Sequence, residues 1–292
     1  MRQFLCQRSF FLKNEYNAFH GGLVAGKATS LISEVDSLPL PADEWRWLHQ
    51  ADALAASGRI EEAVAQLKTL VHALPDSTRG YVRLANLLRQ WRRAGEAREI
   101  LETAVAHVPD CPVSREALAD VCVEIGRYDD AIRHGRALLE LKPRSIHARD
   151  LLSTAYLHRG QYDRALRLTD EMIRLDPFEP AHHFKRGVVL QQAGLLSGSC
   201  EAFQRTLELN PETELQEACR MAIDLLERYQ IRQILTIASD DMLFRLRLLR
   251  DPLDASQQRG FSLSETAIAV LAAQLSHLVP DNQPGWRQYY YH

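Results

Sequence analysis

Residues 146–179 read IHARDLLSTAYLHRGQYDRALRLTDEMIRLDPFE, and the pattern in this stretch decides the fold. Two segments with apolar residues at helical spacing are separated by Gly160, and Pro177 stops the second segment. The same arrangement returns along the chain every 34 residues, a distance that five prolines mark. These prolines are Pro75, Pro109, Pro143, Pro177 and Pro211. A constant period of this kind predicts a stacked array of helix-turn-helix units.

Three further places in the period carry small residues, and each has a mechanical reason. Small side chains at the eighth and twentieth places let two paired helices approach closely, and glycine at the fifteenth place lets the chain turn between them. The eighth place holds Ala51, Ala85, Ala119, Ser153 and Gly187; the fifteenth holds Gly58, Gly126, Gly160 and Gly194; the twentieth holds Ala63, Ala97, Ala131 and Ala165.

These marks resemble the tetratricopeptide repeat (TPR) family over residues 44–213. The resemblance implies an all-α, right-handed superhelical solenoid. Its five full repeats would span 44–77, 78–111, 112–145, 146–179 and 180–213. In this family the first helix of each repeat lines a groove that receives a protein or peptide partner. The resemblance therefore implies a non-catalytic binding scaffold or adaptor.

The segments on either side of the array are expected to complete it. Pro41 stands one period before Pro75, which indicates a half repeat at 25–43 after an N-terminal arm at 1–24. Residues 214–238 have an amphipathic pattern without the repeat marks, as expected of a capping helix that closes a solenoid. A small helical tail follows at 239–280, with one helix ending at Asp251-Pro252 and a second beginning at Ser262 and running to about Leu278. Residues 281–292 form an aromatic tail.

Composition and charge exclude several classes of protein. A net charge of -3 argues against nucleic-acid binding, which usually needs a basic face. No segment reaches the roughly 20 apolar residues that a membrane span requires. Arg8 and Lys13 interrupt the apolar residues near the N-terminus, so a secretion signal is not expected. Five cysteines without a C-x-x-C pair are typical of reduced thiols, and they predict a cytoplasmic protein.

Motifs for catalysis, metals and cofactors are absent or incomplete. The stretch Gly21 to Thr29 nearly spells a phosphate-binding loop, but Ala28 replaces the hydroxyl residue and no apolar strand precedes it. His182 and His183 are adjacent on a helix and point in different directions, so they cannot easily chelate one ion. His147 and His158 are separated by three helical turns, which is too far for them to share a metal ion. The sequence therefore predicts no enzyme activity, no cofactor and no metal.

Carried over residue by residue, the resemblance places a partner-binding groove on the first helices. Its predicted residues are Trp45, Asp52, Arg79, Asn86, Arg89, Glu116, Asp120, His147, Asp150, Phe184 and Gln191. The second repeat is basic at these places and the third is acidic, so the partner is expected to be amphoteric or to extend across a change of charge. The same charges are also typical of a solvated helix face. Of the residues with which some family members grip a terminal carboxylate, only Asn86 is present, so that mode is not expected.

A second resemblance lies outside the array. Residues 241–263 contain D-x-x-F-R-x-x-L-L-x-D-P, which resembles the nitrile-hydratase-like leader regions of ribosomally made, modified peptides. This resemblance implies a docking helix for a tailoring enzyme, made by Phe244, Arg245, Leu248 and Leu249. The tail WRQYYYH would then be the modified part, with Trp286, Tyr289, Tyr290, Tyr291 and His292 as targets of an oxidative enzyme. The alternatives are thus a binding scaffold and a precursor-type substrate protein.

Overall fold

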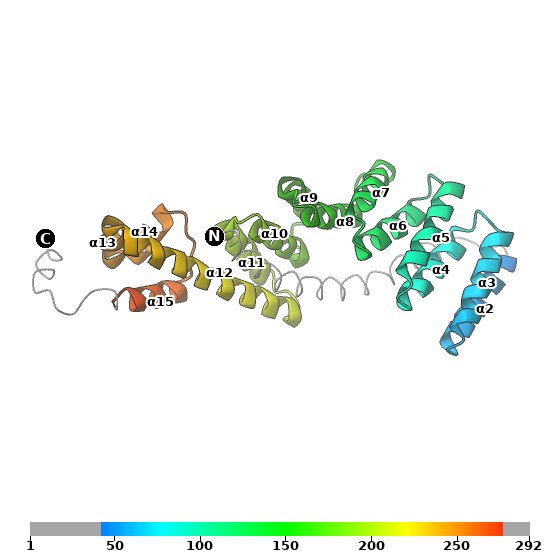
Figure 1. Cartoon of the computed structure of the whole chain (residues 1–292), viewed down its shortest axis with the longest axis horizontal. Helices are drawn as coiled ribbons and strands as arrows, with labels where there is room; N and C mark the ends of the chain where they lie inside the picture. Colours follow the sequence, from blue (N-terminus) through cyan, green and yellow to red (C-terminus); the bar gives the residue numbers. More distant parts are fainter. Residues whose placement is uncertain (1–41, 277–292) are drawn as a thin grey trace, which may run out of the picture. The chain divides into compact units, whose positions relative to one another are not determined.

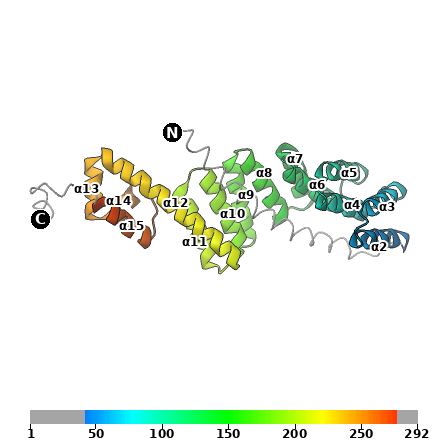
Figure 2. The same cartoon turned by 60° about the horizontal axis from the view of Figure 1, so that its bottom comes forward.

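The structure, a computed structural model, describes residues 42–276, and in this range it contains fourteen α-helices and no β-strand. The chain divides into two compact units, at residues 1–175 and 176–292. The helices are labelled in Figure 1 and are seen from a second direction in Figure 2. The predicted all-α repeat fold is confirmed for the described residues. The arm at 1–24, nearly all of the half repeat at 25–43 and the aromatic tail at 281–292 lie outside them.

Unit 1 contains four pairs of helices, and each pair is one repeat (Figure 1). The pairs are α2 (Ala42–Ala56) with α3 (Ile60–Ala73), α4 (Thr78–Gln90) with α5 (Ala94–His107), α6 (Pro112–Glu124) with α7 (Tyr128–Leu141), and α8 (Ile146–His158) with α9 (Tyr162–Leu175). The first helix of a pair also contacts the second helix of the preceding pair, for example α4 against α3 and α8 against α7. Stacking of neighbours therefore buries one continuous core, which a single pair could not form alone.

Local sequence explains where these helices begin and turn. The hydroxyls of Ser77 and Ser145 cap α4 and α8 by accepting hydrogen bonds from the third backbone N–H beyond them, at 3.0 and 3.1 Å. Pro112 stands in the first turn of α6, where its missing N–H costs nothing. At the turn between paired helices, glycines such as Gly160 have positive φ angles. The second repeat has Arg92 at this place, also with a positive φ, of 58°.

The small residues of the period lie at the contact between paired helices. Ala85, Ala119 and Ser153 at the eighth place are fully buried, as are the alanines at the twentieth place. The Ser153 hydroxyl donates to the backbone carbonyl of Ala165, at 3.4 Å, so the two places touch directly. Larger side chains at either place would separate the helices.

Unit 2 begins with the fifth helix pair, α10 (Pro180–Gln192) and α11 (Leu196–Glu208). The long helix α12 (Thr213–Asp240) follows and contacts α11, α13 and α15. Three shorter helices complete the unit: α13 (Met242–Arg250), α14 (Pro252–Gln258) and α15 (Glu265–Ser276). They enclose a core with the second half of α12, in which Ile234, Leu248 and Leu271 are fully buried. The division into two units falls after α9.

The sequence missed α14 and misplaced the start of α15. Pro252 reads as a stop signal, but it occupies the first turn of α14, and Asp251 caps that helix by accepting from the backbone N–H of Asp254 at 3.0 Å. The predicted cap of the last helix, Ser262, instead donates its backbone N–H to the side chain of Gln230. Ser264 is the residue whose hydroxyl accepts from the helix, at the N–H of Ala267.

Candidate protein-binding surface

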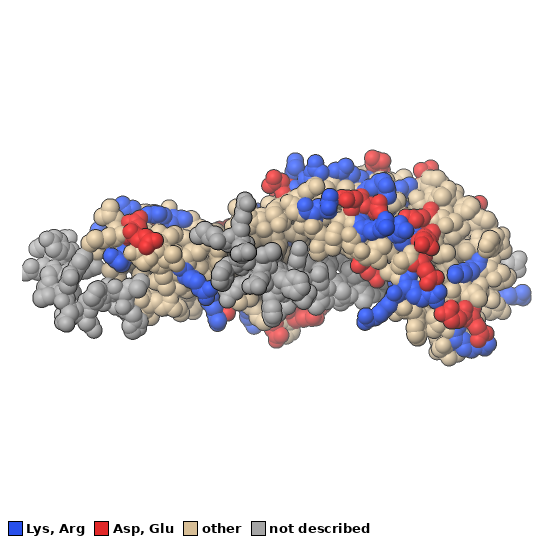
Figure 3. Space-filling view, in the orientation of Figure 1, with Lys and Arg blue, Asp and Glu red and all other residues tan. Residues whose placement is uncertain are grey.

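The residues predicted to face a partner in unit 1 lie on its four first helices, α2, α4, α6 and α8. We call this set, together with Glu124, the first-helix surface. Its members are Trp45, Asp52, Arg79, Asn86, Arg89, Glu116, Asp120, Glu124, His147 and Asp150. The surface is mixed in charge, and Figure 3 shows that acidic and basic side chains are also interspersed on the visible face of the molecule.

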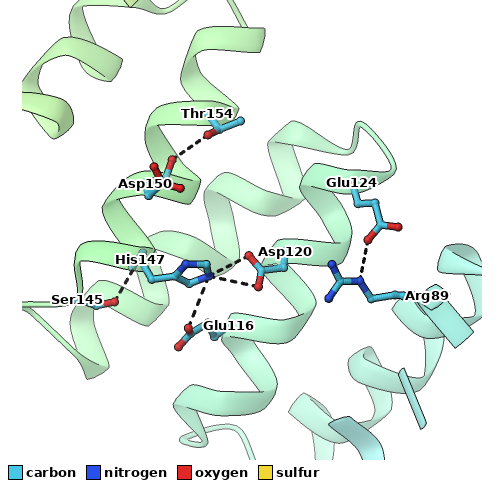
Figure 4. Close-up of polar contacts among 9 residues, drawn as sticks. Arg89, Glu116, Asp120, Glu124, Ser145, His147, Asp150 and Thr154 are labelled. Atoms are coloured by element: carbon cyan, nitrogen blue, oxygen red, sulfur yellow. Dashed lines mark hydrogen bonds and ion pairs between the residues drawn. The ribbon is translucent and has the colours of Figure 1, made fainter. Parts of the chain in front are cut away.

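A cluster of three ionisable side chains lies between α6 and α8 (Figure 4). Nε2 of His147 lies 3.0 and 3.2 Å from the two carboxylate oxygens of Asp120, and 3.6 Å from Oε1 of Glu116. The side chains of Glu116 and Asp120 are only 9% and 12% exposed, and that of His147 is 25% exposed. The structure thus brings together three predicted site residues from two successive repeats.

The charge state of this cluster follows from its surroundings. Burial alone would lower the pKa of His147, but the hydrogen bond to Asp120 and the charges of Asp120, Glu116 and Asp150 raise that pKa to about 9. The imidazole is therefore protonated at neutral pH, and its Nε2–H donates to Asp120. The cluster therefore combines one imidazolium with the acidic side chains of Glu116 and Asp120.

Two further ion pairs join successive first helices. Nε of Arg89 on α4 lies 2.7 Å from Oε2 of Glu124 on α6 (Figure 4). The guanidinium of Arg83 on α4 lies 3.5 Å from the carboxylate of Asp52 on α2. Each boundary between repeats in unit 1 therefore has an ionic contact across the first helices. Arg83 was not among the predicted residues, and only its charge opposite to that of Asp52 could have indicated the pair.

Two members of the surface offer groups to a ligand. The amide nitrogen of Asn86 is buried and has no hydrogen-bond partner among the described residues. Trp45 is 55% exposed and lies against the ring of His49, with 4.9 Å between ring centroids. Aromatic residues are enriched at protein interfaces, and a buried amide without an acceptor is costly.

The remaining predicted residues have more local roles or lie in unit 2. The backbone carbonyl of Asp150 accepts a hydrogen bond from the Thr154 hydroxyl at 2.9 Å, one turn along α8. Arg79 is half-buried on α4. Phe184 and Gln191 are half-buried on α10 in unit 2, where the Phe184 ring packs at a tilt against Phe203.

The predicted docking helix corresponds to α13, but its apolar residues face inward. Phe244 is 2% exposed and Leu248 is 0% exposed, while Arg245 and Leu249 are half-buried. The ridge therefore packs into the core of unit 2 instead of lying open to solvent. The predicted modified tail, Trp286, Tyr289, Tyr290, Tyr291 and His292, lies outside the described residues.

The other motif residues of this segment also have structural contacts. Asp241 accepts a hydrogen bond from the backbone N–H of Phe244 at 2.9 Å and lies 2.6 Å from the guanidinium of Arg259. That guanidinium stands over the Phe244 ring, 4.7 Å from its centroid. These contacts explain the spacing of the motif by the fold of unit 2.

Residues 42–276 offer neither a metal site nor a membrane-spanning helix. No group of three or more His, Cys, Asp or Glu side chains in this range is arranged to hold a metal ion. Among the helices of the same range, none combines the length and the apolar character needed to cross a bilayer.

Comparison with known proteins finds one matching family model. The sequence profile of the tetratricopeptide repeat matches residues 54–121 and 123–185. No curated protein matches the whole sequence significantly.

Solved structures share the fold. One is "MamA 41-end from Desulfovibrio magneticus RS-1", which is 18% identical with a TM-score of 0.53 over 59% of this chain and 97% of that one. Another is YrrB, described as "a TPR protein with an unusual peptide-binding site", which is 18% identical with a TM-score of 0.51 over 66% of this chain and 97% of that one. At this identity the likeness concerns the fold alone.

Proposed function

We propose that this chain, whose residues 54–121 and 123–185 match the tetratricopeptide repeat profile, is a non-catalytic scaffold or adaptor that binds a protein or peptide. The proposed binding site is the first-helix surface of unit 1. The observation that carries the proposal is the half-buried cluster of Glu116, Asp120 and His147. The cluster lies on α6 and α8, and the neighbouring helix α4 holds Arg79 and Arg89 at its groove places.

The partner that fits this surface is an extended segment with charges of both signs. A basic side chain would be attracted to the cluster on α6 and α8, and an acidic one to the arginines of α4. The unpartnered amide of Asn86 could donate to a backbone carbonyl of the segment, which would relieve a buried, unsatisfied donor. A solenoid that is already folded loses little conformational entropy on binding, which favours affinity.

A peptide array tests the proposal. The full chain, labelled with a fluorophore, is applied to an array of ten-residue peptides that vary in charge pattern. We expect selective binding to peptides that combine basic and acidic residues, and weaker binding at high salt because the contacts are partly exposed. The variant Glu116→Gln, Asp120→Asn removes both carboxylates at nearly constant size, and we expect it to lose peptides whose basic residue is essential.

The matched control is Glu99→Gln, Glu102→Gln on α5, which also removes two carboxylates. Glu102 is a second-helix carboxylate paired with Arg98 at 2.7 Å, so its removal changes net charge without touching the first-helix surface. Equal loss of binding in both variants would mean that overall charge matters and not this site. Unchanged binding in the double variant would show that the binding site does not lie on α6 and α8.

No observation favours the alternative of a substrate protein. Its docking residues Phe244 and Leu248 are buried in unit 2. A cytoplasmic location also stays a prediction, drawn from the cysteine pattern.

A further inference from the structure

Cys111 occupies an unusual position among the cysteines of the described chain. It is the N-cap residue of α6 and is half-buried, whereas Cys122, Cys200 and Cys219 are buried. The hydroxyl of Thr78, the first residue of α4, donates to the Cys111 sulfur at 3.5 Å. The sulfur thus lies where the N-terminal ends of two successive first helices meet. The positive end of a helix dipole favours a thiolate over a thiol.

The surroundings of the four thiols also favour ionisation of Cys111 over ionisation of the three buried cysteines. Burial alone would raise the pKa of Cys111, but the backbone N–H of Ser114, the hydroxyls of Thr78 and Ser114, and the N–H of Val113 act in the other direction, and the net pKa is lowered. Burial raises the pKa of Cys122 and of Cys200 to about 11, and that of Cys219 to about 12. Only the thiolate is a strong nucleophile.

Ser114 supplies a second, independent observation. Its side chain is 0% exposed, and its hydroxyl has no hydrogen-bond partner of normal geometry among residues 42–276. This hydroxyl nevertheless lies close enough to the Cys111 sulfur to affect its ionisation. A sulfur atom is only a weak acceptor, and an oxygen atom attached to it would give this buried hydroxyl a stronger one.

We propose that Cys111 is a site of reversible oxidation by hydrogen peroxide, with Ser114 as the residue that receives the added oxygen. The thiolate sulfur attacks one peroxide oxygen, the O–O bond breaks, and the leaving hydroxide takes a proton from a buffer acid to form water. Sulfur loses two electrons and becomes a sulfenic acid, while the peroxide is reduced to water. The Ser114 hydroxyl then donates to the sulfenic oxygen. One thiol such as glutathione displaces water to form a mixed disulfide, and a second thiol then releases the Cys111 thiol as the two become a disulfide.

The experiment uses the full chain with Cys6→Ser, because Cys6 lies outside the described residues. The folded protein is treated at pH 7 with limiting hydrogen peroxide and dimedone, which traps sulfenic acids, and each cysteine peptide is analysed by mass spectrometry. We expect Cys111 to be labelled at least about tenfold faster than the three buried cysteines. In a second measurement, alkylation of Cys111 by iodoacetamide is followed against pH, with an expected midpoint below the ~8.5 of a free thiol.

Variants show whether Cys111 reacts because Ser114 and Thr78 activate its thiol or only because the thiol is accessible. Ser114→Ala and Thr78→Val should each raise the alkylation midpoint and slow the trapping by dimedone. Ser153→Ala, which removes another fully buried serine hydroxyl, should change neither. The proposal is overturned if Cys111 is labelled no faster than Cys122, if its midpoint equals that of a free thiol, or if both Ser114→Ala and Thr78→Val leave the midpoint unchanged.

Discussion

His147 Nε2 lies 3.0 Å from a carboxylate oxygen of Asp120, and this contact joins the first helices of two successive repeats. Both residues occupy places that the repeat pattern assigns to a partner. In the folded chain they already satisfy each other, and Arg89 and Glu124 do the same one repeat earlier. A partner that uses these charges must therefore compete with, or add to, contacts inside the protein. The ionic contacts of the surface serve the stacking of repeats as well as recognition.

The first prediction concerns alkaline pH. The pKa of His147 is raised from 6.5 to about 9, so its protonated form stabilises the fold. This contribution is complete below pH ~6.5, the value in the unfolded chain, and is lost as pH rises through about 9. A shift of this size corresponds to at most roughly 3 kcal/mol. We expect the melting temperature to fall between pH 6.5 and 9.5, and His147→Gln to reduce that fall.

An exposed histidine provides the control. His72 lies in the last turn of α3 and is exposed, so His72→Gln should leave the slope of melting temperature against pH unchanged. Parallel curves for His147→Gln and the parent would show that the imidazolium does not hold α6 to α8.

The second prediction concerns acid. Burial lowers the pKa of His134 on α7 to about 4, and the nearby cations Arg133 and Arg115 act in the same direction, against the weaker effect of Asp130. The neutral form is therefore favoured in the folded state. Its contribution is present above pH ~6.5 and is lost as pH falls from there toward 4.

Urea titrations at pH 7, 5.5 and 4.5 measure this effect. The parent should lose stability steadily across the series, and His134→Gln should lose less, because it has no group to protonate in the unfolded chain. An identical loss in parent and variant would show that His134 does not cause the acid sensitivity.

How much of the candidate site could be predicted from the sequence differs between residues. The period of 34 puts Glu116, Asp120 and His147 on first helices, because each lies at a fixed distance from a repeat proline. It does not show that they contact one another, since a contact between helices depends on their separation and on side-chain direction. Ser114 has no chemical motif around it, and its relation to Cys111 emerges only when the helix end is folded.

For the fold as well, the sequence predicts features set by local backbone conformation better than features set by tertiary packing. Repeat marks such as Gly160 and Pro177 act locally, through backbone conformation, so they predict the helix pairs well. In unit 2 the same reasoning fails at Pro252, because proline both stops one helix and begins another. The inward direction of Phe244 could not be read from its spacing, because one apolar ridge can face a core or a partner equally well.

The third prediction compares two helical glycines of unit 2. A Cβ atom on Gly187 would lie 2.7 to 3.0 Å from three atoms of the Phe203 ring, whereas one on Gly198 would meet Leu190 at an ordinary 3.6 Å. Alanine is the better helix former by up to about 1 kcal/mol, so Gly198→Ala should raise the melting temperature. Gly187→Ala should lower the melting temperature and reduce the free energy of unfolding by about 1–3 kcal/mol, because the buried ring must move. Thermal melting followed by circular dichroism measures both, and equal effects would contradict the close packing of α10 on α11.

The last prediction tests the role of α13. Phe244 is 2% exposed and lies under the guanidinium of Arg259, while its neighbour Leu243 is 70% exposed. Phe244→Ala should therefore cost roughly 3–5 kcal/mol of stability. Leu243→Ala removes a comparable side chain from the same helix, but from solvent, and should change stability by less than about 0.5 kcal/mol. Hydrogen exchange of α12–α15 measures both variants in the full chain. If Phe244→Ala left exchange as slow as in the parent, the ring would not belong to the core, and the docking role suggested by its motif would become the better explanation.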